Sequence, residues 1–112
     1  MSYATDTLTG QQRAVAVLAA ILATPGLAPA TWSIRPDSMC IASDTARLEG
    51  QLSSRQSIDD LRAAIDAYFI VFGLRLDEDA WMPGTDYCAA FTEVSTSGLI
   101  DGVRVKVWGA GR

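Results

Sequence analysis

The first regular pattern of apolar residues runs from Thr9 to Thr24 and repeats at helical spacing. Small and polar residues occupy one side of this pattern, and Pro25-Gly26 ends it. The pattern predicts a helix over Thr9–Thr24 that packs its bulky side on a sheet. At about 100° per residue, the bulky side is an arc of roughly 160° that holds Val15, Val17, Leu18, Ile21 and Leu22.

The same segment also has features of a secretory signal. Arg13 precedes the apolar run Ala14–Ala23, and Ala28-Pro29-Ala30 is typical of a cleavage site with small residues. Two features favour a helix of the folded domain instead. Thr9 and Gln12 have the spacing of a capping box, and a signal needs no division into a bulky and a small side. We therefore expect the helix, with a signal peptide as the alternative.

A second helical pattern lies between Ser57 and Gly73 and is the clearest one in the chain. Ser57, with Asp60 three residues later, predicts an N-terminal cap. Gly73 predicts a left-handed stop. The apolar residues that repeat between them are Ile58, Leu61, Ile65, Tyr68 and Phe72. Because caps and period agree, the sequence predicts an amphipathic helix here.

Alternating apolar and polar residues predict a first hairpin after the first helix. Its strands are Thr31–Arg35 and Met39–Leu48, joined by a turn at Pro36-Asp37-Ser38. Gly50–Gln56 is polar and is expected to be the connector that leads to the second helix.

A second hairpin is predicted near the end of the chain, after an acidic connector over Leu74–Asp86. Alternation starts at Tyr87–Val94, and Gly98 is expected to mark a bulge before the turn. Asp101-Gly102 is a strong signal for a tight hairpin turn. In the last strand, one face is predicted to be buried and consists of Val103, Val105 and Val107.

These elements predict a two-layer α+β fold in the order helix–hairpin–helix–hairpin. An antiparallel sheet of four to five strands would carry both helices on one face. We expect residues 1–112 to form a single domain, with residues 1–7 and 109–112 flexible. The order of the elements resembles that of small acidic secretion chaperones. This resemblance implies a dimer that holds partner chains.

Charge and composition narrow the range of functions. The net charge is −4, and all of it arises from Ser57 onward, where nine acidic residues meet five basic ones. Direct nucleic-acid binding is not expected, because a phosphate backbone requires clustered Lys and Arg. No apolar run approaches 18 residues, so no membrane span is expected. We expect a cytoplasmic protein with ordinary globular composition, 49% hydrophobic and 20% charged.

The chain contains no His and no Asn. The lack of His excludes Ser-His-Asp and Cys-His catalysis and any His metal ligand. Two cysteines cannot form a four-thiolate zinc site. We expect Cys40 and Cys88 to be two buried thiols, with one disulfide between them as the alternative. No metal ion or other cofactor is expected.

Candidate partner-binding residues fall in two places, the acidic connector and the last strand. Asp77-Glu78-Asp79 is expected to be a solvated loop and lacks the spacing of a calcium site. Trp81-Met82 follows it and either covers the apolar end of the second helix or contacts a partner. Arg104, Lys106 and Trp108 lie on the polar face of the last strand. If that strand is an edge, it suits strand addition or dimer formation, unless the two cations prevent it.

The sequence therefore favours a non-enzymatic protein-interaction module, an adaptor, inhibitor or chaperone-like accessory protein that uses an acidic and aromatic surface. The partner expected is another protein, with a homodimer as one form. One alternative is a small-molecule binder or cofactor-free enzyme with a pocket between sheet and helices, lined by Tyr68, Phe69, Phe72 and Phe91. Another is an acidic mimic of nucleic acid, with the carboxylates of Asp77–Asp86 on one surface.

Overall fold

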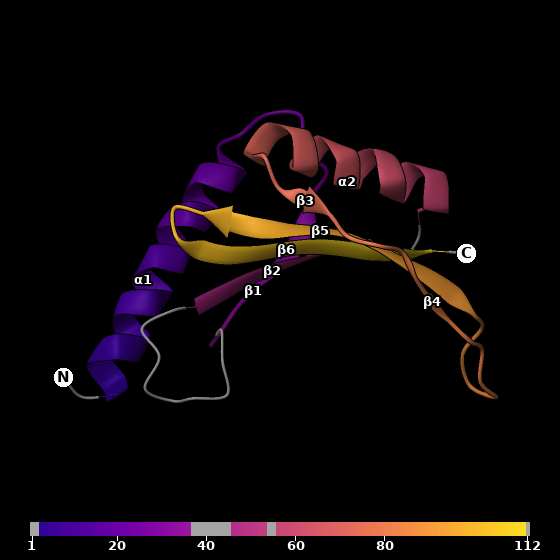
Figure 1. Cartoon of the computed structure of the whole chain (residues 1–112), viewed down its shortest axis with the longest axis horizontal. Helices are drawn as coiled ribbons and strands as arrows, with labels where there is room; N and C mark the ends of the chain where they lie inside the picture. The colour runs from indigo at the N-terminus through magenta and orange to yellow at the C-terminus, as the bar shows by residue number, and fades with distance from the viewer. Residues whose placement is uncertain (1–2, 37–45, 54–55, 112) are drawn as a thin grey trace.

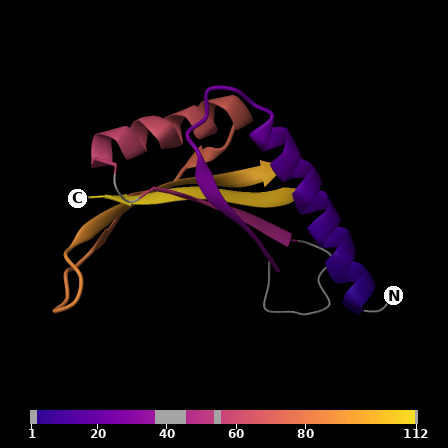
Figure 2. The ribbon, with the colours of Figure 1, turned by 180° about the vertical axis from the view of Figure 1, so that it is seen from behind.

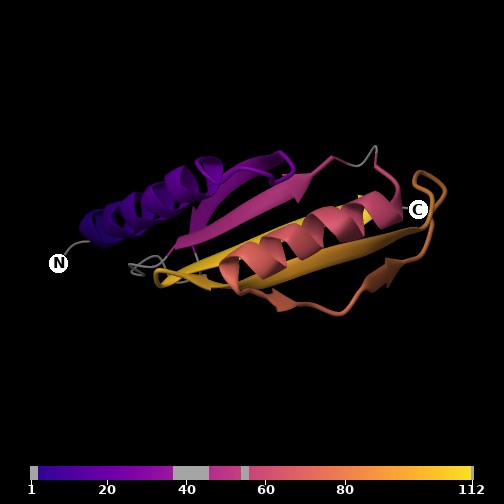
Figure 3. The ribbon, with the colours of Figure 1, turned by 90° about the horizontal axis from the view of Figure 1, so that it is seen from above.

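The computed structural model describes residues 3–36, 46–53 and 56–111. Within these segments two helices and six strands follow one another (Figure 1): α1 (Tyr3–Leu22), β1 (Ala30–Pro36), β2 (Ala46–Leu52), α2 (Ile58–Phe72), β3 (Arg75–Leu76), β4 (Ala80–Met82), β5 (Phe91–Ile100) and β6 (Val103–Gly111). Both helices lie on the same side of one sheet (Figure 3). The α+β class predicted from the sequence is confirmed.

The sheet is mixed and six-stranded, whereas the sequence predicted an antiparallel sheet of four to five strands. Its order is β1-β2-β6-β5-β3, and β4 also pairs with β5. The prediction is wrong because β2 and β6 are parallel, and because β3 and β4 add short strands beside β5. With β6 between β2 and β5, Val105 and Val107 have neighbouring strands on both sides and are 0% exposed. Burial of apolar side chains thus favours this central position.

The first helix differs from its prediction in both length and buried face. α1 begins at Tyr3 and ends at Leu22, so part of the segment 1–7 that was expected to be flexible is helical. Val15 and Leu22, placed on the buried arc by the sequence, are 55% and 67% exposed. The sheet therefore covers a narrower stripe of the helix than the 160° arc. The side chains of α1 in the core are Ala14, Val17 and Ile21.

The apolar run Ala14–Ala23, which has features of a secretory signal, lies in α1 up to Leu22. Ala14, Val17 and Ile21 of this run pack in the core of the fold. No helix in the described segments combines the length and the apolar character that crossing a bilayer requires.

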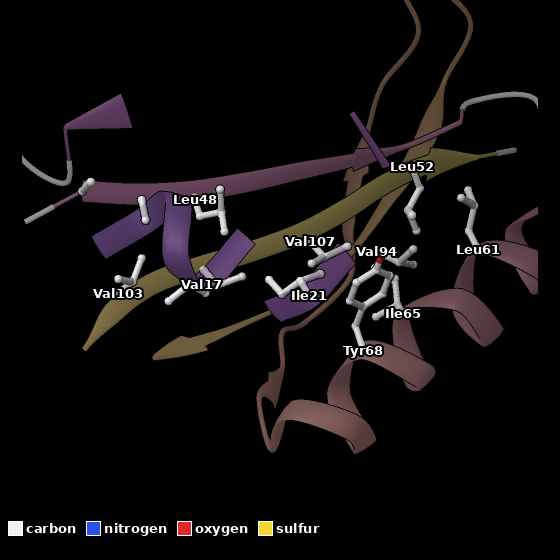
Figure 4. Packing of buried hydrophobic residues seen from close by; sticks show 13 residues of the cluster. Val17, Ile21, Leu48, Leu52, Leu61, Ile65, Tyr68, Val94, Val103 and Val107 are labelled. Atoms are coloured by element: carbon white, nitrogen blue, oxygen red, sulfur yellow. The ribbon is translucent and has the colours of Figure 1, made fainter. Parts of the chain in front are cut away.

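The second helix begins and ends where the sequence predicts. The Ser57 side chain accepts a hydrogen bond from the Asp60 backbone N–H at 3.2 Å, and Gly73 adopts a left-handed conformation with φ of 63°. Leu61, Ile65 and Tyr68 face the sheet and are at most 2% exposed (Figure 4). This agreement reflects local signals, because caps and period require only neighbouring residues.

Tyr68 joins α2 to the segment that precedes β1. Its hydroxyl donates a hydrogen bond to the Ala28 carbonyl oxygen at 2.5 Å. Its ring makes an edge contact with Trp32, with centroids 6.2 Å apart, and a tilted contact with Phe72. Burial raises the pKa of the Tyr68 hydroxyl above its usual value of 10.0. The phenol is therefore a structural donor at neutral pH.

The first predicted hairpin is only partly observed. β1 confirms the predicted strand Thr31–Arg35. Pro36 of the predicted turn ends β1, whereas Asp37, Ser38 and most of the predicted strand Met39–Leu48 lie outside the described residues. β2 runs on to Leu52, so the expectation that Gly50–Gln56 is entirely a connector is wrong. Gly50 pairs with Trp32 across the two strands, an arrangement that alternation alone did not reveal.

The tight turn of the second hairpin is confirmed. Asp101 and Gly102 both have positive φ, 49° and 79°, as a type I′ turn requires. The strand predicted from Tyr87 begins only at Phe91. The predicted connector Leu74–Asp86 contains β3 and β4, which are two and three residues long. Strands this short have no detectable period.

Glycines near the second hairpin allow close packing, which the sequence analysis missed. Gly98 pairs regularly with Val105, so the predicted bulge is wrong. A Cβ on Gly98 would lie 3.1 Å from Leu74 Cδ2. Gly109 and Gly111 belong to β6 and are buried, so the expectation that residues 109–112 are flexible is wrong for 109–111. These two glycines lie against Leu61 of α2.

Candidate functional site

Strand residues that alternate with the core residues point to the face of the sheet that neither helix covers, the lower face in Figures 1 and 2. We call it the open face. Three of the predicted partner-binding residues lie on it, in β6: Arg104, Lys106 and Trp108. Their neighbours on β2 are Arg47, Glu49 and Gln51, and their neighbours on β5 are Leu99, Ser97 and Ser95.

Trp108 is held in place at the centre of the open face. Its ring Nε1–H donates a hydrogen bond to Glu49 Oε1 at 2.9 Å, and the other oxygen of Glu49 lies 3.1 Å from Arg47. β6 is flanked by β2 and β5, so the edge position on which strand addition depended is not present. β6 therefore has no free edge near Trp108 to which a further strand could be added. Arg104 and Lys106 do not protect an exposed strand edge.

The acidic run divides among three environments. Asp77 accepts hydrogen bonds from the hydroxyls of Ser95 and Ser97, both at 2.9 Å. Asp79 forms an ion pair with Arg62 at 2.6 Å. Glu78 is exposed. The three carboxylates thus do not converge on one point, which leaves little support for a continuous acidic surface.

Replacement of Asp77 by alanine is expected to lower the free energy of unfolding by about 1–2 kcal/mol, since two serine hydroxyls lose a charged acceptor. Ser95 is only 7% exposed, so water replaces that acceptor poorly. Urea unfolding of the purified protein measures the change. Glu78→Ala is the matched control, with an expected change within about 0.5 kcal/mol. Equal losses in the two variants would contradict this role of Asp77.

The hairpin formed by β4 and the first half of β5 projects from one end of the sheet (Figures 1 and 2). We call residues 80–94 the projecting hairpin. Trp81 is 66% exposed, Met82 47% and Tyr87 99%. The expectation that Trp81 covers the apolar end of α2 is therefore wrong. By the strand register, Trp81 lies on the helix side with Thr92, and Met82 lies on the open face with Phe91.

The tip of the projecting hairpin is ordered by Thr85. Its hydroxyl accepts hydrogen bonds from the backbone N–H groups of Tyr87 and Cys88 at 3.2 and 3.1 Å. The Thr85 N–H donates to the Cys88 carbonyl oxygen. Cys88 is an exposed free thiol, so the prediction of a buried thiol is wrong there, and Cys40 lies outside the described residues.

The aromatic residues proposed for a pocket between sheet and helices do not line one cavity. Tyr68 and Phe72 pack against each other and belong to the core. Phe91 pairs with Met82 at the start of β5, on the opposite face of the sheet. A pocket of the composition that the sequence suggested is therefore absent from the described part of the chain.

The structure reveals a hollow that sequence analysis missed, near the β5–β6 turn. Its volume is about 460 Å³, and it opens on the open face. Four of its lining residues are cations from three strands, and the full lining consists of Arg47, Gly73, Leu74, Arg75, Ser97, Gly98, Leu99, Arg104 and Lys106. The scattered positions of these cations in the sequence gave no signal, because strand register alone brings them together.

The chain was compared with protein-family models, with curated proteins and with solved structures, and none of the three comparisons found a match. Its function is therefore argued from the geometry of the open face and the projecting hairpin.

Proposed function

We propose that this chain is a non-enzymatic protein-interaction module that binds its partner through the projecting hairpin. The observation that carries the proposal is the exposure of Trp81, Met82 and Tyr87, three large side chains within seven residues. Tryptophan and tyrosine are enriched among residues that dominate binding energies, and methionine adapts to partner surfaces. Side chains of this size gain free energy when a partner removes them from water.

The geometry of the hairpin supports this role. Trp81 and Met82 point to opposite faces of the ribbon, so a partner that encloses the hairpin contacts apolar side chains on both sides. The three hydrogen bonds around Thr85 and Cys88 order the tip before binding. Less conformational entropy is then lost on association. The partner we expect is a protein with an apolar groove, and a homodimer is the alternative.

Chemical crosslinking and light scattering of the purified protein, together with quantitative pull-down, test the proposal. Trp81→Ala is expected to weaken association by about tenfold or more, the effect typical of a binding hot spot. Ile70→Ala is the matched control, because Ile70 is 73% exposed on α2, away from the hairpin. Equal binding by wild type and Trp81→Ala, or a monomer without a stoichiometric partner, would contradict the proposal.

A further inference from the structure

Three arginines stand side by side on the open face. The register pairs Arg35 with Arg47 between β1 and β2, and Arg47 with Arg104 between β2 and β6. Like charges directly opposite each other in a sheet are destabilising. Neutral residues at these positions would spare the fold this repulsion in a chain whose net charge is −4. The row therefore concentrates positive charge on one part of the open face.

Two members of this row, Arg47 and Arg104, line the hollow near the β5–β6 turn, together with Arg75 and Lys106. Among residues 3–36, 46–53 and 56–111, no acidic residue lines the hollow. Three of these cations pair with carboxylates outside its lining: Arg47 with Glu49, Arg75 with Asp77 and Lys106 with Glu93. Four cationic residues thus line one space of about 460 Å³.

One atom in the hollow's wall lacks a partner. Arg47 Nε is buried from solvent and makes no hydrogen bond. A buried donor that is left unsatisfied costs free energy, so the Arg47 guanidinium keeps hydrogen-bonding capacity that the fold does not use. The Arg47 side chain as a whole remains 38% exposed, so an anion in the hollow can reach it.

The chemistry of the lining restricts the ligand. Arginine forks match the geometry of carboxylate and phosphate groups. Leu74 and Leu99 add apolar wall, and Leu99 is 66% exposed. A long polyanion does not fit, because Asp77 and Glu93 lie farther along the same face. The ligand is therefore compact, with an anionic group and a short apolar portion.

We propose that this hollow is a binding site for a compact oxyanion ligand, a small dicarboxylate or phosphomonoester, held by Arg47, Arg75, Arg104 and Lys106. Leu99 contacts the apolar portion of the ligand. The site is independent of the projecting hairpin, since Phe91 and Leu99 are about 27 Å apart along β5 at the usual rise per residue. Either proposal can therefore fail without the other.

Titration of the full chain with inorganic phosphate and, separately, with succinate tests the proposal, with sodium chloride at matched ionic strength as the salt control. Amide chemical shifts and the unfolding temperature are the readouts. Arg104→Gln and Arg75→Gln are the test variants, and the Arg75 side chain is 80% exposed, so its replacement leaves the core intact. Arg13→Gln, an exposed cation on α1, is the matched control.

We expect saturable shifts at Ser97, Gly98 and Leu99 with at least one of the two anions and none with chloride. The anion that binds more tightly identifies the source of the charge. Affinity falls by about tenfold or more in Arg104→Gln and Arg75→Gln, the loss typical of a charge-assisted hydrogen bond, and stays unchanged in Arg13→Gln. Shifts that do not saturate with either anion, or equal affinity in all three variants, would overturn the proposal.

Discussion

Replacement of Leu61 by alanine is expected to lower the free energy of unfolding by about 2–5 kcal/mol, in the upper part of that range. Leu61 is 0% exposed and lies over two glycines of β6. Its Cδ2 is 2.7 Å from the position of a Cβ on Gly109, and its Cδ1 is 2.9 Å from that of a Cβ on Gly111. The strand below offers no side chain that can move into the vacated space, so the cavity persists.

Urea unfolding measures this loss, and Ile70→Ala on the exposed side of the same helix is the control, with an expected change within about 0.5 kcal/mol. A double-mutant cycle with Gly109→Ala sharpens the test. In the wild type the added methyl group collides with Leu61 and lies 3.3 Å from Leu52 Cβ, so Gly109→Ala destabilises. In Leu61→Ala it fills the cavity, and the loss shrinks or reverses. Identical effects of Gly109→Ala in both backgrounds would contradict this packing.

Replacement of Gly50 by alanine is expected to lower the free energy of unfolding by about 1–3 kcal/mol through overpacking. Three atoms of the Trp32 ring lie 2.8–3.0 Å from the position of a Cβ on Gly50. The ring is rigid and also contacts Tyr68, so it cannot turn away without loss of that edge contact. Near-ultraviolet circular dichroism is expected to change together with stability, because the tryptophan is displaced.

Gln51→Ala, at the next and exposed position of β2, is the control for Gly50→Ala and is expected to change stability by less than about 0.5 kcal/mol. A smaller residue at position 32 is expected to relieve the clash. Trp32→Leu therefore lowers the additional loss caused by Gly50→Ala. If Gly50→Ala is as stable as the wild type, the ring does not lie on this glycine.

The parts of the fold that depend on neighbouring residues were predictable from the sequence. The cap at Ser57, the stop at Gly73 and the turn at Asp101-Gly102 each need only a few adjacent residues, and all three are confirmed. The burial of alternate valines in β6 was predictable for the same reason, because alternation has a period of two.

The parts that depend on distant pairing were not predictable. Nothing near Trp108 indicates that Arg47–Gln51 lies beside it, so the sequence left open whether this strand lies at an edge. Gly109 and Gly111 were expected to be flexible, because the sequence does not show that Leu61 of α2 packs against them. Exposure of Trp81 likewise follows from the position of the projecting hairpin and not from its composition. The row of Arg35, Arg47 and Arg104 forms only through the β1–β2 register together with the β2–β6 register. The pattern of residues along the sequence reveals neither register.

The central place of β6 in the sheet has a consequence for folding kinetics. β2 gains a second neighbour only when residues 103–111 arrive, about fifty positions later in the chain. Closing a chain loop of this length costs conformational entropy before the contacts between β2 and β6 can compensate for it. Until then one border of β2 stays unpaired, and α1 lacks the contacts that β6 supplies. Folding is therefore expected to be cooperative and comparatively slow. The sheet is completed only when the C-terminal hairpin of β5 and β6 pairs with β2.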